Sequence, residues 1–197
     1  MTVLTTTERK RLLQAIVYFA ANTAYCGKIK LFKLLYLLDF EHFRQTGRSA
    51  TGLDYQAWKF GPVPIELMEE WEELGDDMAQ LVHIVEERVF DYDRQTVHAN
   101  ADVVFDPDDF TERQLRIMQG LVDQYKDTYS PKMIDVTHAQ NGAWDKAWRG
   151  GQGARAPIPY ELALDAAEPQ SEQILMIARE QAMYRDALLA SRRADFA

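Results

Sequence analysis

Residues 28–46 form the segment that most constrains how this chain folds. At about 100° per residue in a helix, one narrow stripe of the segment carries Lys30, Lys33, Leu37, Glu41 and Arg44. The rest of the circumference is nearly all apolar. A helix of this kind must pack against neighbours on several sides. The segment therefore predicts the central buried helix of a compact domain, ended by Gly47, a residue suited to a left-handed cap.

Asp39 lies in the middle of the apolar arc of this segment, between Phe32, Leu35 and Phe43. A buried carboxylate costs several kcal/mol unless it is paired or hydrogen-bonded. We therefore expect Asp39 to be a structural residue with fixed donors, either backbone N–H groups of residues 61–64 or an indole N–H.

The remaining segments predict a mainly α fold with a small inserted antiparallel β-sheet. Capping boxes at Thr5–Glu8 and Thr111–Gln114 open two helices, and a long helix is expected over residues 171–193. Residues 81–105 read as two or three short strands. We expect residues 1–170 to form one domain, with the C-terminal helix of 171–197 packed on it or extending it.

Residues 53–77 are predicted to form, in this order, a strand, a turn and a helix. The run ends at Phe60, Gly61-Pro62-Val63-Pro64 forms the turn, and Pro64 opens a helix to about Asp77. Glycine at position 61 suggests a backbone angle that other residues resist. Further along, residues 149–156 are expected to form a flexible loop.

Charge and cysteine content narrow the class of protein. With 31 acidic and 22 basic residues, the net charge is −9, which repels phosphate backbones and disfavours nucleic acid as a partner. The longest basic run, Arg9-Lys10-Arg11, is expected to be a solvated face. Cys26 has no second cysteine to pair with, and neither a signal peptide nor a membrane-spanning run is evident. We expect a cytoplasmic protein with no membrane partner.

A search for catalytic or metal-binding patterns identifies no catalytic, cofactor-binding or metal-ligating residues. The four histidines have no metal-ligand spacing, and the sequence lacks nucleophile-elbow, phosphate-loop and dinucleotide motifs. We therefore expect a protein that is not an enzyme and needs no cofactor. An acid–base enzyme that uses Asp39 and His138 stays open as an alternative.

Two features are candidates for binding a partner protein. Seven acids and no base occur in residues 66–77, either as a solvated face or as a dock for a basic partner. Trp144 and Trp148 share a helical face, either in the core or in an exposed patch. The candidate partner-binding residues are Glu66, Glu69, Glu70, Glu73, Asp76, Trp144 and Trp148.

Three stretches together resemble the Panacea (SocA-like) antitoxin domain family. They are the Lys33-Leu34-Leu35-Tyr36 helix continuing to Asp39, the Trp58-Lys59-Phe60-Gly61-Pro62-Val63 turn, and Thr137-His138 with Trp144 and Pro157-Ile158. They span about residues 10 to 165. The structural signature residues are Lys33, Tyr36, Asp39, Trp58, Gly61, Pro62, Val63 and His138.

The resemblance implies an antitoxin of a bacterial type II toxin–antitoxin system that neutralises a co-encoded toxin by direct contact. It leaves open a second function, a SocA-like adaptor that delivers the toxin to the ClpXP protease. A DNA-binding segment precedes the domain in many relatives, and the start of the signature helix near residue 28 leaves no room for one here. The chain after about Ser171 lies outside the resemblance and is a candidate toxin-specific addition.

Overall fold

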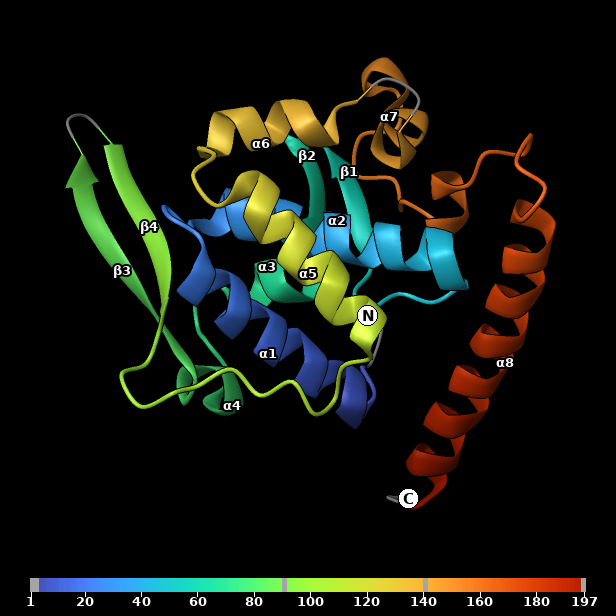
Figure 1. Ribbon diagram of the computed structural model, residues 1–197, viewed down its shortest axis with the longest axis horizontal. Helices are drawn as coiled ribbons and strands as arrows, with labels where there is room; N and C mark the ends of the chain where they lie inside the picture. The colour runs from blue at the N-terminus through green and yellow to red at the C-terminus, as the bar shows by residue number, and fades with distance from the viewer. Residues whose placement is uncertain (1–3, 90–91, 140–141, 196–197) are drawn as a thin grey trace.

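A computed structural model describes residues 4–89, 92–139 and 142–195, and its helices are arranged around one central helix (Figure 1). The elements run in the order α1 (Thr6–Asn22), α2 (Lys28–Thr46), β1 (Tyr55–Trp58), β2 (Gly61–Pro64), α3 (Ile65–Glu70), α4 (Asp76–Ala79), β3 (Val82–Val89), β4 (Tyr92–Ala99), α5 (Glu112–Tyr125), α6 (Ser130–Thr137), α7 (Ala143–Trp148), η1 (Arg149–Gly151), η2 (Tyr160–Ala163) and α8 (Ser171–Asp195). The mainly α fold with small antiparallel β-structure is confirmed.

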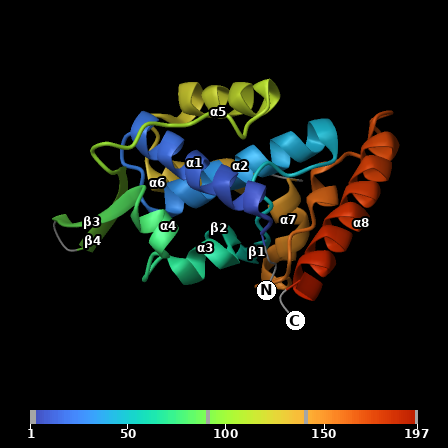
Figure 2. The same cartoon turned by 90° about the horizontal axis from the view of Figure 1, so that it is seen from below.

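The central helix is α2, as its apolar circumference predicts. It contacts α1, α5, α6, β2, η2 and α8, and its core-facing residues are buried along its whole length. Figure 2 shows α5 on one side of the layer formed by α1 and α2, with α3 on the other side. The helix ends at Gly47, whose φ of 71° is the left-handed conformation expected of the cap. The polar stripe is not all solvated, because Lys30 and Lys33 are also buried.

Helix α1 begins at the predicted capping box. The Thr5 hydroxyl accepts from the Glu8 N–H, and the Glu8 carboxylate accepts from the Thr5 N–H. The expectation that Arg9-Lys10-Arg11 is a solvated face is wrong for two of its members. Arg9 forms ion pairs with Glu70 and Asp77, and Arg11 is half-buried.

The segment 61–64 is a β-strand rather than the predicted turn. β1 and β2 pair antiparallel with Trp58 opposite Gly61, so the turn itself is Lys59–Phe60. Gly61 has a φ of 103°, a conformation that side chains disfavour, and this confirms the reason given for glycine at that position. The proline-containing strand is tolerated because a two-stranded hairpin leaves the outer edge of β2 without a ladder partner.

The acidic helix predicted over residues 64–77 is broken into two short helices, α3 and α4. The chain leaves the helix at Trp71, whose buried indole packs edge-on against Phe32 with ring centroids 5.5 Å apart. The Glu70 carboxylate accepts from the Gly75 N–H at 3.2 Å and stabilises the turn between α3 and α4. The helix therefore ends where Trp71 is buried, although the helical periodicity of the sequence continues beyond it.

The region 81–105 contains a single hairpin, β3–β4, in which Val82 pairs with Ala99. The third possible strand, at residues 103–105, is irregular, and Val104 is exposed. The hairpin is anchored near the first helical turn of α2, because the Val97 N–H donates to the Cys26 carbonyl at 2.9 Å. The structure thus has two separate two-stranded sheets.

The C-terminal third of the chain packs against β1 and the end of α2. Residues 149–156, expected to be flexible, are tied to β1, because Arg155 N–H donates to the Ala57 carbonyl at 2.8 Å and Ala57 N–H to the Ala156 carbonyl at 2.9 Å. Helix α8 forms as predicted and packs Ile174 against Phe43 and Leu164. Within the described residues, no helix combines the length and hydrophobicity required to cross a membrane.

Candidate functional site

The residues of the family-like motifs converge on one side of α2. We call Lys33, Tyr36, Trp58, Gly61, Pro62, His138 and Trp144 the signature cluster; they come from α2, the β1–β2 hairpin, the end of α6 and α7. Lys33 Nζ donates to the Pro62 carbonyl at 2.8 Å, which fixes the hairpin on α2. The lysine stem also occupies the space beside Gly61, where a Cβ would lie 2.7 Å from Nζ.

Trp144 is the centre of the signature cluster. Its indole N–H donates to the Trp58 carbonyl at 3.1 Å, and its backbone N–H donates to the Tyr36 hydroxyl at 3.1 Å. Its ring stacks on His138 with centroids 3.7 Å apart and on Trp148 with centroids 5.5 Å apart. These contacts join three segments that are far apart in the sequence.

The charges of the signature cluster are suppressed by burial. Burial lowers the pKa of Lys33 to about 7, and burial together with the nearby Lys33 charge lowers the pKa of His138. Lys33 is only 2% exposed, so its amine is not accessible to a substrate in this conformation. The arrangement connects α2, the β1–β2 hairpin, α6 and α7 through hydrogen bonds and stacked rings.

Asp39 is fully buried and hydrogen-bonded, as expected, but its donors differ from those predicted. The carboxylate accepts from the backbone N–H groups of Ala50 and Thr51, at 2.8 and 2.7 Å, and from the hydroxyls of Thr51 and Tyr55, at 2.6 and 2.8 Å. Neither the 61–64 segment nor an indole contributes. Burial raises the pKa of Asp39 to about 6 although all four bonds oppose that shift.

The predicted acidic dock is divided by the break between α3 and α4. Glu70 is paired with Arg9, with Nη1 2.7 Å from its carboxylate, and Glu66 is half-buried at the first turn of α3. We call the exposed remainder, Glu69, Glu73 and Asp76, the acidic surface. Asp77 shares Arg9, and that hydrogen bond lowers the pKa of its carboxyl group.

The tryptophan pair is part of the interior. Trp144 is 4% exposed, and Trp148 is half-buried beside it. Of the two positions considered, core and exposed patch, the structure therefore places Trp144 in the core. Val63 lies half-buried in β2, next to the signature cluster.

The structure also contains an exposed aromatic site that the sequence patterns do not predict. Tyr25 and Tyr129 stack with centroids 4.6 Å apart, and Ile29 is exposed at the start of α2; we call these three the tyrosine patch. Tyr25 has a φ of 54°, which is uncommon for a residue with a side chain. Below it, the fully buried Lys30 donates to the carbonyls of Ala24 and Lys126, both at 2.8 Å. No local pattern relates the two tyrosines, because only the fold brings the 23–27 and 126–129 turns together.

The comparisons with known proteins give one positive result. The family model for the antitoxin SocA-like, Panacea domain matches residues 31–145, from the first turn of α2 to the start of α7. Nothing among the curated proteins or the solved structures matches the chain. Among the described residues, no three His, Cys, Asp or Glu side chains are placed to hold a metal ion. The matched region contains the whole signature cluster and more than half of the sequence, and the chain therefore belongs to the antitoxin SocA-like, Panacea domain family.

Proposed function

We propose that this protein is the antitoxin of a bacterial type II toxin–antitoxin pair and that it neutralises a co-encoded toxin in the cytoplasm by direct binding. The observation that carries the proposal is the family match over residues 31–145, which covers the central helix and the segments packed on it. An antitoxin of this kind works through a surface, so the exposed side chains of these segments are the candidates for contact.

The tyrosine patch is the apolar part of the proposed toxin-binding surface. Tyrosine is enriched among residues that dominate binding energy, and a ring already held by stacking loses little freedom when a partner binds. Tyr129 is 57% exposed and Ile29 is 41% exposed. The backbone beneath them is fixed by the hydrogen bonds of Lys30.

The acidic surface supplies the electrostatic part. Lys28 joins the two parts, because it neighbours Ile29 and its Nζ lies 3.1 Å from the Glu72 carboxylate. Glu69, Glu73 and Asp76 lie on the same short segment as Glu72. An acidic surface next to an apolar patch favours a basic partner and speeds its approach. We propose a toxin with a basic, partly apolar contact surface.

Titration of the purified toxin encoded by the neighbouring gene tests the proposal. If binding is the mechanism, toxin activity falls in proportion to added antitoxin and reaches zero near equimolar amounts. Ile29→Glu should weaken inhibition strongly, because a charge at the patch must be desolvated. Val104→Glu is the matched control, since Val104 is an exposed apolar residue that belongs to neither part of the proposed surface.

Two outcomes would contradict sequestration. Complete inhibition at about a tenth of the toxin concentration, without protease, would reveal turnover, because a one-to-one binder cannot titrate a tenfold excess. Loss of rescue in cells that lack ClpXP, with a longer toxin half-life, would assign the protein to the adaptor class.

A further inference from the structure

A cleft of about 730 Å³ lies between α8 and the rest of the molecule. Its walls come from α1, the end of α2, the start of α5, η2 and α8, and Figure 1 shows α8 beside the end of α2. Phe43 and Tyr160 stack within it, with centroids 5.3 Å apart, and Ile177 of α8 faces them across the cleft. A volume of this size suits a small molecule.

Four arginines line this cleft: Arg11 from α1, Arg48 from the turn after α2, Arg113 from α5, and Arg185 from α8, which pairs with Glu8. Within the described parts of the chain, Arg11, Arg48 and Arg113 form no ion pair, and neither do the exposed Arg149, Arg155 and Arg179, whereas Arg9, Arg44, Arg88, Arg94, Arg116 and Arg185 all do. Among the described residues, Arg113 donates to the Gln45 amide oxygen at 3.3 Å, and Arg11 to the Thr7 carbonyl at 3.5 Å. A cluster of unneutralised guanidinium groups is unexpected in a chain of net charge −9.

Three carboxylates, Glu8, Asp54 and Glu161, also line the cleft, but among the described residues none forms an ion pair with Arg11, Arg48 or Arg113. The Glu8 carboxylate is bound by Arg185, with Nε 2.9 Å away. Burial lowers the pKa of Arg11, although the charges of Glu8, Asp39 and Asp109 oppose that shift. His42 is buried at the same wall; its Nδ1 donates to the Arg48 carbonyl at 2.8 Å.

We infer that this cleft binds a small phosphate-bearing ligand. The planar guanidinium fork matches phosphate oxygens in paired hydrogen bonds, and three such groups exceed what a single carboxylate needs. Tyr160, which is half-buried and stacked on the buried Phe43, provides the apolar part of the wall for the rest of the ligand. A concave site on an acidic protein favours a small ligand over a nucleic-acid backbone, which would meet the repulsion of the whole molecule.

A ligand bound in the cleft should stabilise the packing of α8 against the rest of the molecule. It is one wall of the cleft, and its contact with the body depends on Ile174, on close approach to Gly47 and on the Arg185–Glu8 pair. A ligand that bridges this wall and the three arginines stabilises the docked position of α8. Binding therefore raises the melting temperature by mass action.

The test uses the purified full chain without a toxin, so its outcome is independent of the proposed function. Inorganic phosphate and pyrophosphate are titrated by calorimetry and by thermal unfolding, at low and high salt. We expect binding that raises the melting temperature and weakens with salt. Arg48→Gln and Arg113→Gln should each raise the dissociation constant about tenfold, because each removes a charge-assisted contact.

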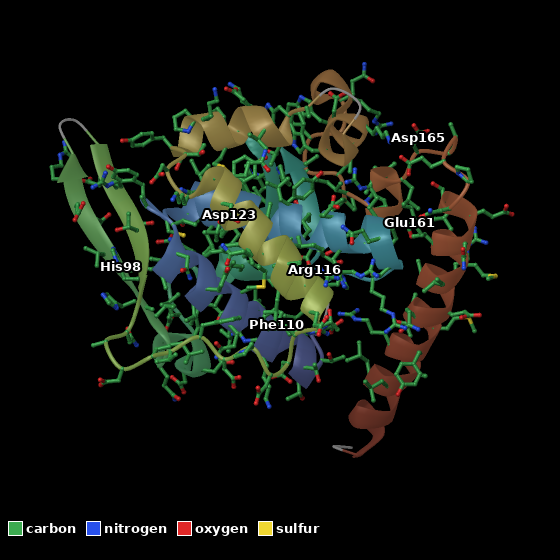
Figure 3. The ribbon with its side chains drawn as sticks, viewed as in Figure 1. His98, Phe110, Arg116, Asp123, Glu161 and Asp165 are labelled. Carbon is green, nitrogen blue, oxygen red and sulfur yellow. The ribbon has the colours of Figure 1, made fainter. Side chains whose placement is uncertain are left out.

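Arg116→Gln is the matched control. Arg116 lies on the same helix as Arg113, one turn away and outside the cleft, and its partner is Glu112 at 3.8 Å (Figure 3). Binding that Arg116→Gln leaves unchanged, and that the two cleft variants weaken, supports the inference. Equal weakening by all three variants overturns it, because the effect would then come from net charge alone.

Three further results overturn the inference. The first is the absence of binding at millimolar phosphate and pyrophosphate. The second is binding of a short oligonucleotide in preference to either small anion, which would assign the arginines to a nucleic-acid backbone. The third is binding of a glutamate-rich peptide but neither phosphate, which would assign the cleft to an acidic protein segment.

Discussion

At the scale of single residues, the buried polar groups of α2 show how much a side chain's environment decides its role. Asp39 has four donors and stays charged near neutral pH. Lys33 has one acceptor, the Pro62 carbonyl, and its pKa is lowered to about 7. The difference follows from the number of hydrogen bonds available to each charged form.

Asp39→Ala should lower the free energy of unfolding by about 3 kcal/mol, because buried donors of Ala50, Thr51 and Tyr55 lose their acceptor. Asp39→Asn should cost less, about 1 kcal/mol, since its oxygen keeps two backbone donors and both hydroxyls can turn to accept. Urea unfolding measures both. A stable Asp39→Ala variant that no longer neutralises toxin would make Asp39 a contact residue instead.

The stability of the protein should depend on pH through Lys33. The folded pKa of about 7 lies below the ordinary lysine pKa of 10.5, so the unfolded chain holds more protons between these values. Stability from this group therefore rises as pH increases, by about 2 kcal/mol between pH 7 and 9. Lys33→Met, which keeps the stem and removes the charge, should flatten that rise. An identical pH profile for the two proteins would exclude a neutral Lys33.

At the scale of elements, short segments depend on their neighbours more than on their own pattern. The acidic run has helical periodicity, yet the helix ends at Glu70 because Trp71 packs on Phe32. The 61–64 segment carries two prolines, yet it forms a strand because Lys33 holds its carbonyl at Pro62. The two capping boxes, by contrast, begin helices wherever they occur, because their hydrogen bonds are local.

Gly61→Ala should destabilise the hairpin by about 2 kcal/mol, because position 61 has a positive φ and an added Cβ meets Lys33 and Thr137. Gly120→Ala is the control: this helical glycine has nothing within 4 Å of an added Cβ, and alanine should stabilise α5 by up to about 1 kcal/mol. Thermal unfolding of the pair gives opposite signs if the local geometry is correct. Equal effects would refute it.

Removal of α8 tests the division at residue 170. A chain ending at Gln170 should still fold, with a loss of about 2 kcal/mol, because Ile174 is the main buried residue that α8 supplies. Circular dichroism and urea unfolding measure the result, with Ile174→Ala as the point variant of comparable cost. A truncated chain without a cooperative transition would show that α8 belongs to the domain itself.

At the scale of the whole molecule, the acidic surface and the arginines of the cleft lie on different elements. Glu69, Glu73 and Asp76 lie exposed on the α3–α4 segment, whereas Arg11, Arg48 and Arg113 line the cleft beside α8. The electrostatic potential of such exposed charges attracts approaching partners of opposite charge, but it changes the free energy of unfolding little. The two surfaces therefore suit two different ligands.

Charge reversal at the acidic surface should slow toxin association. Glu69→Lys with Glu73→Lys is expected to lower the association rate about tenfold at low salt and to flatten its salt dependence. Stability should change by less than about 0.5 kcal/mol, because both side chains are exposed. Glu168→Lys with Glu180→Lys changes the net charge equally at exposed positions elsewhere. An equal effect of the two pairs would remove the acidic surface from the interface.

The sequence by itself determined the features that depend on periodicity or on contacts a few residues apart. These include the central helix α2, the capped starts of α1 and α5, the glycine requirement at position 61 and the burial of Asp39 with donors. Each follows from local geometry or from the cost of burying polar groups, so no knowledge of distant partners is needed.

Only the tertiary structure decided which distant groups meet. In the structure, the backbone of residues 50–51 and the Tyr55 hydroxyl donate to Asp39, and Arg9 pairs with Glu70. Tyr25 stacks on Tyr129, and Arg11, Arg48 and Arg113 line one cleft. Contacts between residues far apart in the chain depend on how the elements pack, and packing is settled by burial across the whole core. These contacts therefore cannot be predicted from the pattern of any single segment.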